Sequence, residues 1–256
     1  MDITSLIRPE TKYVLKNDKL FFSEVPNNAK MHDESKKYIR DFSVQRKTAI
    51  EYFKRILERE DHTKVFCDVG IGTNRYEELT RLFHKKIGID FVPYSGVNIV
   101  ADLTKPLPLK DSSVDIVFLT EVLEHIPNPE LLISEIYRIL KPSGYCLGSV
   151  PFLHPIHSAP YDFHRYTNFA LDTLFRENNF KDIEIKNIGT PFEVYKSFHN
   201  RFFNVYAMRH PNIFIRTLFR FSRKLHHLLL GVCSRFYKSL PEQDDFVLAY
   251  YFKAKK

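Results

Sequence analysis

A loop between residues 151 and 167 holds a high density of side chains that can move protons or bind charge. Its titratable members are His154, His157, Asp162, His164 and Arg165. Imidazoles and carboxylates exchange protons near neutral pH, and a guanidinium binds anions, so this mixture is typical of a site that deprotonates a polar substrate. We expect His157 or His164 to be the base and Arg165 to hold an anionic group.

Two other interpretations of the loop stay open. The possible metal ligands are His154, His157, Asp162 and His164. None of these pairs has the i,i+4 spacing of a helix and prolines interrupt the segment, so we assign no metal. A polar surface loop with aromatic anchors is the second interpretation. His125, earlier in the chain, is a further candidate base, or it hydrogen-bonds the turn at a helix entry.

A glycine turn forms the second group with chemical potential. A β-branched run ends at Asp68 and is followed by Gly70 and Gly72, immediately before a helical pattern. Glycines at such a turn let the backbone approach a nucleotide closely, and the helix N-terminus offers unpaired N–H groups. A tight turn without a ligand would use the same glycines.

Two carboxylates end the next two predicted strands. Asp90 follows Gly72 by 18 residues, where an acid accepts hydrogen bonds from both ribose hydroxyls. Asp102 closes the following strand, beside where an adenine would lie. Either residue alone is explained as a polar strand end. At consecutive strand ends, in this order, they favour a nucleotide site.

Positioning these residues requires an α/β framework. The predicted strands are 64–69, 87–90, 98–101, 114–119, 145–150, 181–188 and 246–252. The predicted helices lie within 35–60, 76–83, 128–140 and 171–178. Strands separated by helices favour a doubly wound, largely parallel sheet. We divide the chain into an N-terminal arm over 1–34, a main domain over 35–193 with 241–256, and an insert over 194–240.

Together these motifs make the sequence resemble the class I S-adenosylmethionine-dependent methyltransferases, type-11 branch. The matching segments are Asp68-Val-Gly-Ile-Gly-Thr, Gly88-Ile-Asp90, Ala101-Asp102-Leu103, Pro106-Leu-Pro108, Asp111-Ser-Ser-Val-Asp115, Glu121-Val-Leu-Glu-His125-Ile-Pro127 and Glu135-Ile-Tyr-Arg-Ile-Leu-Lys-Pro-Ser-Gly144. The run Pro160-Tyr-Asp-Phe-His-Arg-Tyr-Thr167 is similar to a segment in methyltransferases of bacterial surface-polysaccharide loci.

The resemblance implies a seven-stranded sheet with an antiparallel last strand and S-adenosylmethionine as cofactor. It places Asp90 on the ribose, Asp102 on the adenine, and Glu121 or its neighbours near the methionine end. The expected cofactor-binding residues are Asp68, Gly70, Gly72, Asp90, Asp102, Leu103 and Glu121. The third glycine of the family turn is Asn74 here, which tolerates left-handed geometry and can cap the next helix. A dehydrogenase is disfavoured, because Arg75 stands where its fingerprint needs a glycine.

The positive charge of the chain is concentrated in the predicted insert. The net charge is +7, yet the segment 194–241 alone carries nine Lys or Arg and no acid. From Phe214 to Phe236 apolar residues recur every three or four positions, which predicts one helix of about 25 residues over 213–238. Three roles fit it: packing on the domain's own core, a dimer interface, or an anionic membrane surface.

Composition narrows the setting. The chain has 44% hydrophobic and 27% charged residues, which is typical of a soluble globular protein. Three scattered cysteines and no signal-like start suit the cytoplasm. We therefore expect an enzyme that O-methylates a sugar or lipid-linked glycan at the inner membrane face. The alternatives are a small-molecule or nucleic-acid methyltransferase, with nucleic acid disfavoured by the localised charge, and an inactive cofactor-binding scaffold.

Overall fold

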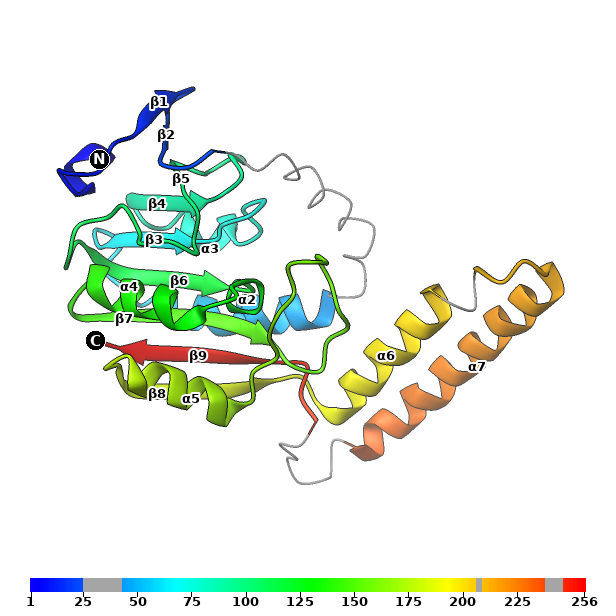
Figure 1. The fold of residues 1–256 in the computed structure, drawn as a ribbon. Coiled ribbons are helices and arrows are strands. Elements are labelled where there is room, and N and C mark those ends of the chain that lie inside the picture. The colour runs from blue at the N-terminus through cyan, green and yellow to red at the C-terminus, as the bar shows by residue number, and fades with distance from the viewer. Residues whose placement is uncertain (25–42, 206–208, 238–245) are drawn as a thin grey trace.

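The computed structural model describes residues 1–24, 43–205, 209–237 and 246–256 (Figure 1). The strands are β1 (Val14–Lys16), β2 (Lys19–Phe21), β3 (Val65–Val69), β4 (Lys85–Asp90), β5 (Ile99–Val100), β6 (Val114–Thr120), β7 (Leu140–Pro151), β8 (Lys181–Ile188) and β9 (Ala249–Lys255). The helices are α2 (Ser43–Leu57), α3 (Glu77–Thr80), α4 (Pro129–Ile139), α5 (Asn168–Glu177), α6 (Pro191–Val205) and α7 (Ile213–Tyr237), with 3-10 turns η1 (Ile3–Leu6) and η3 (Leu123–His125).

A single sheet organises these elements, in the strand order β1-β2-β5-β4-β3-β6-β7-β9-β8. Strands β5, β4, β3, β6 and β7 are parallel, and β9 runs antiparallel between β7 and β8. The predicted α/β class and the antiparallel last strand agree with this arrangement. The predicted number of seven strands is wrong, because the N-terminal segment adds β1 and β2 at one edge and makes the sheet nine-stranded.

The first 24 residues pack on the sheet instead of forming a loose arm. Strand β2 pairs in parallel with β5, with Leu20 opposite Ile99, and the side chains of Ile7 and Leu20 are buried. Two- and three-residue pairings are too short to produce a clear alternation of polar and apolar residues, so the sequence pattern missed them. Residues 25–34 of the predicted arm and 35–42 of the predicted helix lie outside the described residues.

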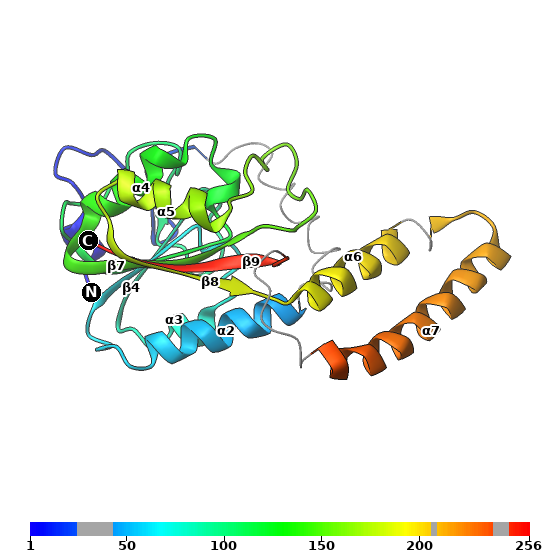
Figure 2. The ribbon, with the colours of Figure 1, turned by 90° about the horizontal axis from the view of Figure 1, so that it is seen from below.

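Helices cover both faces of the sheet, with α2 and α3 on one side and α4 and α5 on the other (Figure 2). Alternation along a strand explains how one sequence serves both layers. Phe66 and Phe118 pack with Phe53 of α2, whereas Cys67 and Val117 join the cluster that contains the apolar face of α4. The central strands are therefore buried on both faces, and their polar residues gather at the carboxyl ends, where the site is built.

Helices α6 and α7 form a hairpin that extends away from the sheet (Figures 1 and 2). The helix predicted over 213–238 corresponds to α7, and Lys238 lies outside the described residues. The helices meet through Tyr195 Oη, 2.8 Å from His226 Nε2, and through the stacked rings of His199 and His226.

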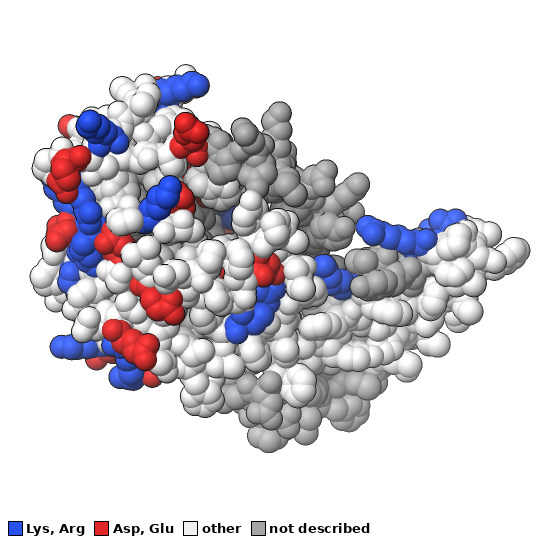
Figure 3. Space-filling view, in the orientation of Figure 1, with Lys and Arg blue, Asp and Glu red and all other residues white. Residues whose placement is uncertain are grey.

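The predicted apolar face of α7 points to solvent. Its described members are Phe214, Leu218, Phe221, Leu225 and Leu228, which are 49–81% exposed. Packing on the domain's own core, one of the three roles considered, does not hold for them. The visible surface of the hairpin in Figure 3 carries basic side chains and no acidic ones. Among the described residues, this apolar face on a basic helix has no partner that covers it.

We expect Gly148→Ala to destabilise the fold. Gly148 lies in β7 between β6 and β9, where an added Cβ would collide with Leu119 O and would lie 2.5 Å from Phe252 Cζ. Overpacking against backbone in a sheet lowers the free energy of unfolding by about 3 kcal/mol, measurable in urea. Gly231→Ala in α7 is the control: no atom is within 4 Å of its new Cβ, so stability should not fall. Equal stability of both variants would contradict the packing argument.

Candidate functional site

The turn after β3 has the backbone geometry expected of a ligand-binding glycine turn. Gly70 and Gly72 have positive φ angles of 76° and 55°. A Cβ on Gly70 would collide with Val122 Cγ2, so this residue must be glycine for the turn to pack on the segment after β6. A Cβ on Gly72 would meet only Gly70 O, at 4.0 Å, among the described residues. The backbone at Gly72 therefore faces space that a ligand can use.

Asn74 keeps the left-handed conformation of the glycine it replaces, with a φ of 57°. The predicted helix cap is wrong: α3 begins at Glu77, and the residue at its N-cap is Tyr76. The side-chain amide of Asn74 instead packs against Gly96, where a Cβ would lie 2.9 Å from Asn74 Nδ2. The helix is also only four residues long, because the chain turns repeatedly before it begins.

Asp90 ties the end of β4 to the glycine turn. Its Oδ2 accepts a hydrogen bond from Gly72 N at 2.8 Å, and its Oδ1 accepts one from Val92 N at 2.9 Å. The residue is 4% exposed, and burial raises the pKa of its carboxyl. Each oxygen has a second lone pair, so the carboxylate can still accept hydrogen bonds from a ligand beside Gly72. The carboxylate therefore bonds to the glycine turn itself, a contact that the sequence analysis did not predict, and its assignment to the ribose stays a prediction.

Asp68 lies within β3, one strand over, and burial is the main cause that raises the pKa of its carboxyl to about 7. The nearby Lys86 opposes this shift and Asp90 adds to it. Asp68 is a buried residue of β3, the strand that leads into the glycine turn. Its position therefore favours an indirect role, in which it holds the start of the turn in place.

Asp102 and Leu103 follow β5, the strand next to β4. Asp102 Oδ1 accepts hydrogen bonds from Thr104 N at 2.9 Å and Thr104 Oγ1 at 2.7 Å, and Lys105 Nζ lies 3.4 Å from Oδ2. Burial alone would raise the pKa of this carboxyl, but these contacts outweigh burial and lower it. Leu103 is buried. Ala101 N donates a hydrogen bond to Asp90 O at 3.0 Å. Asp90 and Asp102 therefore lie close together, at the carboxyl ends of neighbouring strands.

Glu121 begins the segment after β6 with a positive φ of 53°. Its Oε1 accepts a hydrogen bond from Ser149 Oγ at 2.9 Å, and its backbone N donates to Ser149 O. Burial raises the pKa of Glu121 to about 7, and the charge of Glu124 adds to the effect. Since the next residue, Val122, touches Gly70, this segment connects the glycine turn with the rest of the site.

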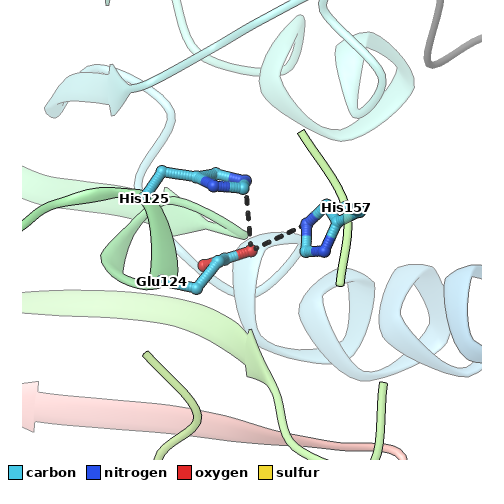
Figure 4. A group of neighbouring side chains, drawn as sticks. All are labelled: Glu124, His125 and His157. Carbon is cyan, nitrogen blue, oxygen red and sulfur yellow. Dashed lines mark ion pairs between the residues drawn. The ribbon is translucent and has the colours of Figure 1, made fainter. Parts of the chain in front are cut away.

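Glu124 is the residue that the sequence analysis did not single out. It lies in η3, is 0% exposed, and neither carboxylate oxygen has a hydrogen-bond partner among the described residues. Its Oε1 lies 3.6 Å from His125 Nε2 and 3.7 Å from His157 Nε2 (Figure 4). Burial raises its pKa to about 7. The sequence signal for this residue was local: Glu124 follows two apolar residues and directly precedes His125. We call Glu124, His125 and His157 the glutamate–histidine cluster.

The predicted bases separate in space. His157 and His125 belong to the cluster, with ring centroids 4.8 Å apart. His164 lies outside it, with Nε2 3.4 Å from Pro127 O. The ring of His154 packs against His157 from the other side, and burial lowers the pKa of His154 to about 3. The four-residue metal set considered from the sequence therefore does not converge, because its members point to different neighbours.

Arg165 organises the loop itself. Its Nη1 and Nη2 donate to the two oxygens of Asp162 at 2.6 and 2.7 Å. It also donates to the carbonyls of His154, Pro155 and His164. Burial alone would raise the pKa of Asp162, but the bonds from Arg165 and from His157 N lower it to about 2. The expectation that Arg165 holds an anionic group finds no support here, because the guanidinium is engaged within the loop.

Comparison with known proteins finds similarity to methyltransferases over the part of the chain that contains this site. Residues 67–148 match the family model described as a methyltransferase domain. A protein of Mycolicibacterium smegmatis named probable S-adenosylmethionine-dependent methyltransferase is 30% identical over 111 residues, which is 39% of this chain. The aligned part spans 42% of that relative's length.

Solved structures share the fold. A SAM-dependent methyltransferase from Archaeoglobus fulgidus is similar with a TM-score of 0.54 and 18% identity, covering 86% of this chain and 99% of that chain. Phosphoethanolamine N-methyltransferase 2 of Haemonchus contortus, solved with S-adenosyl-L-methionine, gives a TM-score of 0.51 at 17% identity, covering 82% of this chain and 52% of that chain. The Rossmann-like methyltransferase fold is thereby supported.

The site residues fit S-adenosylmethionine, the cofactor that these comparisons support. Gly72 presents its backbone to open space, and the buried Asp90 carboxylate beside it retains acceptor capacity for hydroxyls. Asp102 lies at the next strand end, and Glu121 at the end of β6, so donors and acceptors follow one edge of the sheet. This agrees with the crevice at the carboxyl ends of the strands where such folds bind nucleotides.

We expect Asp90→Ala to weaken S-adenosylmethionine binding by about 1.5–3 kcal/mol, because hydrogen bonds to a charged group are lost. Calorimetry measures the affinity, and thermal unfolding checks that the variant is folded. Asp182→Ala, which removes a 70% exposed carboxylate on β8, is the matched control and should bind as the wild type does. Unchanged affinity in a folded Asp90→Ala protein would show that the ribose assignment is wrong.

Proposed function

We propose that this chain is an S-adenosylmethionine-dependent methyltransferase that O-methylates a sugar or lipid-linked glycan at the cytoplasmic face of a membrane. One observation carries the proposal: the glutamate–histidine cluster, with its buried Glu124, begins two residues after Val122, which packs on the glycine turn. When bound, the cofactor supplies an electrophilic methyl group. The chain's own residues must then align an acceptor, exclude water and manage its proton.

The cluster supports a hydroxyl acceptor. An alcohol has to lose its proton as the methyl group is transferred, and this favours imidazole or carboxylate groups close by. His157 comes from the loop after β7 and Glu124 from the turn after β6, so the acceptor would lie where these two segments face each other (Figure 4). The charge of Glu121 raises the pKa of His157, although burial lowers it more, so the cofactor end and the cluster are electrostatically connected.

The hairpin supports a membrane-bound acceptor. Its unpartnered apolar face spans five residues of α7, and the same helix carries Arg216, Arg220, Arg223 and Lys224 in its described part. Each basic residue near an anionic bilayer contributes about 1 kcal/mol, and the apolar face adds burial among the lipid chains. Charge complementarity therefore favours an anionic lipid surface as the occupant of this face. A second copy of the chain is the alternative, because it too would cover the apolar residues.

No helix in the described ranges is both long enough and apolar enough to cross a bilayer.

A small-molecule acceptor is the second candidate for the reaction. Phosphoethanolamine N-methyltransferase 2, of similar fold, acts on a small polar amine according to its name. A nucleic-acid acceptor would use the basic hairpin to contact phosphates. An inactive scaffold would bind no cofactor or transfer no methyl group. Mass spectrometry of glycolipids from cells lacking the gene separates these: the loss of one methyl group from a glycolipid supports the proposal, and an unchanged glycolipid profile contradicts it.

His157→Ala should lower methyl transfer about 100- to 10,000-fold, the usual scale for groups that handle the proton. Cofactor affinity should not change, because His157 belongs to the acceptor side. His164→Ala is the control, since His164 is outside the cluster and should retain most activity. The variants are compared by restoring each to the deletion strain and measuring the methylated glycolipid. Equal activity of His157→Ala and wild type would remove the cluster from catalysis.

The double variant Leu225→Asp, Leu228→Asp should lose binding to vesicles of phosphatidylglycerol and phosphatidylcholine, because charges cannot enter the lipid. Wild type should co-sediment with these vesicles, less at high salt, and weakly with phosphatidylcholine alone. Phe169→Asp, which alters a 77% exposed apolar residue on α5, is the matched control and should still bind. Salt-independent binding to neutral vesicles, or a wild type that does not bind, would count against a membrane role.

A further inference from the structure

The carboxylate of Glu124 lies buried close to two imidazole rings. Both oxygens lack a hydrogen-bond partner among the described residues, although the side chain is fully buried. A buried, unpaired carboxylate is strongly unfavourable. The nearest charged or polar groups are the two imidazole Nε2 atoms, at 3.6 Å in His125 and 3.7 Å in His157. What these nitrogens can offer depends on the other side of each ring.

The far nitrogen of each ring is held by an acceptor. His125 Nδ1 lies 2.5 Å from Tyr161 O, and a carbonyl oxygen only accepts, so Nδ1 carries the proton. His157 Nδ1 lies 3.3 Å from Asp162 Oδ2. Arg165 Nη2 is farther from that nitrogen, at 3.5 Å, and already donates to Asp162 at 2.7 Å. In a neutral imidazole with Nδ1 protonated, Nε2 is an acceptor.

Two nitrogen lone pairs therefore face a carboxylate oxygen, and a cation between them would make the arrangement favourable. We propose that the glutamate–histidine cluster binds a divalent transition metal ion, with Zn²⁺ the best fit. Two imidazoles and one carboxylate form a ligand set that zinc uses at sites with an open fourth position. The contacts at Nδ1 are the kind that orient metal-bound histidines.

The distances suit such an ion after a small adjustment. One ligand atom from each of the three side chains lies within 4.8 Å of the others. Zinc bonds of about 2.0–2.2 Å in a tetrahedron place neighbouring ligand atoms about 3.3 Å apart, so sub-ångström movements close the site. The open fourth coordination position of the ion would face the loop over residues 151–167 and could bind an oxygen of the methyl acceptor. That last role rests on the proposed function, whereas metal binding does not.

The set differs from the one considered from the sequence alone. It keeps His157, replaces the other three members with Glu124 and His125, and draws on two segments that the fold brings together. Asp162 changes from a possible ligand to the residue that orients His157. A proton shared between Glu124 and an imidazole would also relieve the repulsion, and this is the alternative that the experiment distinguishes.

The test uses the full chain, stripped with a chelator and then titrated with Zn²⁺ in the absence of cofactor. We expect one Zn²⁺ per chain by elemental analysis, and Co²⁺ in its place should show the visible bands of a four-coordinate site. Glu124→Gln, close in shape to the native residue, and His125→Ala should each weaken Zn²⁺ binding about 100-fold or more. Circular dichroism verifies that both variants fold.

Two controls locate the ion. His164→Ala, in the same loop but outside the cluster, should retain full affinity. His226→Ala alters a close histidine pair far from the cluster in sequence, formed with His199 in the hairpin, and should also retain full affinity. A wild type that binds no Zn²⁺ at micromolar concentration, full affinity in Glu124→Gln, or loss of binding in His226→Ala would each overturn the proposal. Calorimetry with S-adenosylmethionine on the metal-free chain tests the proposed function separately.

Discussion

The direct packing of Gly70 against Val122 is the contact on which the site depends. It joins the turn after β3 to the segment after β6 with no room for a side chain between them. On the other side of the turn, Asp90 accepts the Gly72 N–H and joins the end of β4 to the same point. The van der Waals contact and the hydrogen bond to the carboxylate thus add to the backbone hydrogen bonds of Gly70 N and Ile71 N to Ile89 O in joining three strand ends. Movement of either would displace the cofactor edge and the cluster together.

The carboxyl ends of the strands form two regions that differ in their electrostatics. At the ends of β4 and β5, Asp90 and Asp102 accept hydrogen bonds from backbone or nearby donors; burial still raises the pKa of Asp90, whereas the contacts of Asp102 lower its pKa. Farther along, Glu121 is half-buried and Glu124 is fully buried, and burial is the main cause that raises the pKa of each to about 7. The bidentate Asp162–Arg165 pair holds the loop over this second region. A low-dielectric pocket of this kind favours the loss of charge that accompanies methyl transfer from a sulfonium.

The hairpin has a different physical character from the sheet domain. The domain buries its apolar residues in two layers around the sheet, whereas α7 presents its most apolar face to solvent and contacts α6 through Phe219 and His226. Exposing an apolar face to water costs about 25 cal/mol of free energy per Å² of apolar surface. A lipid surface or a protein partner that covered the face would remove this cost. The hairpin is connected to the sheet by β8 and β9, next to the loop over residues 151–167 (Figure 1). This position is compatible with presenting a lipid-linked acceptor to the glutamate–histidine cluster.

Local patterns in the sequence were sufficient for the framework and for the cofactor edge. Strand and helix periodicity, the glycines of the turn, and carboxylates at consecutive strand ends depend on near neighbours in the chain. The α/β class and the position of Asp90 at the end of a strand could therefore be predicted. The length of the helix over α7 followed for the same reason. The two strands β1 and β2 were not predicted, because each is three residues long and joins the sheet only through the pairing of β2 with β5.

Long-range packing alone decided what the local patterns left open. Glu124 became a buried group facing two imidazoles because η3 meets a loop more than 30 residues away, a meeting that no sequence spacing encodes. The same packing separated His164 from His157 and turned Arg165 inward to Asp162. It also placed the apolar face of α7 in solvent. The periodicity of the sequence had predicted which residues form this face, but not what they contact. Sequence determines which residues share a face or a strand end; tertiary structure decides which faces and ends meet, because side-chain burial depends on segments distant in the chain.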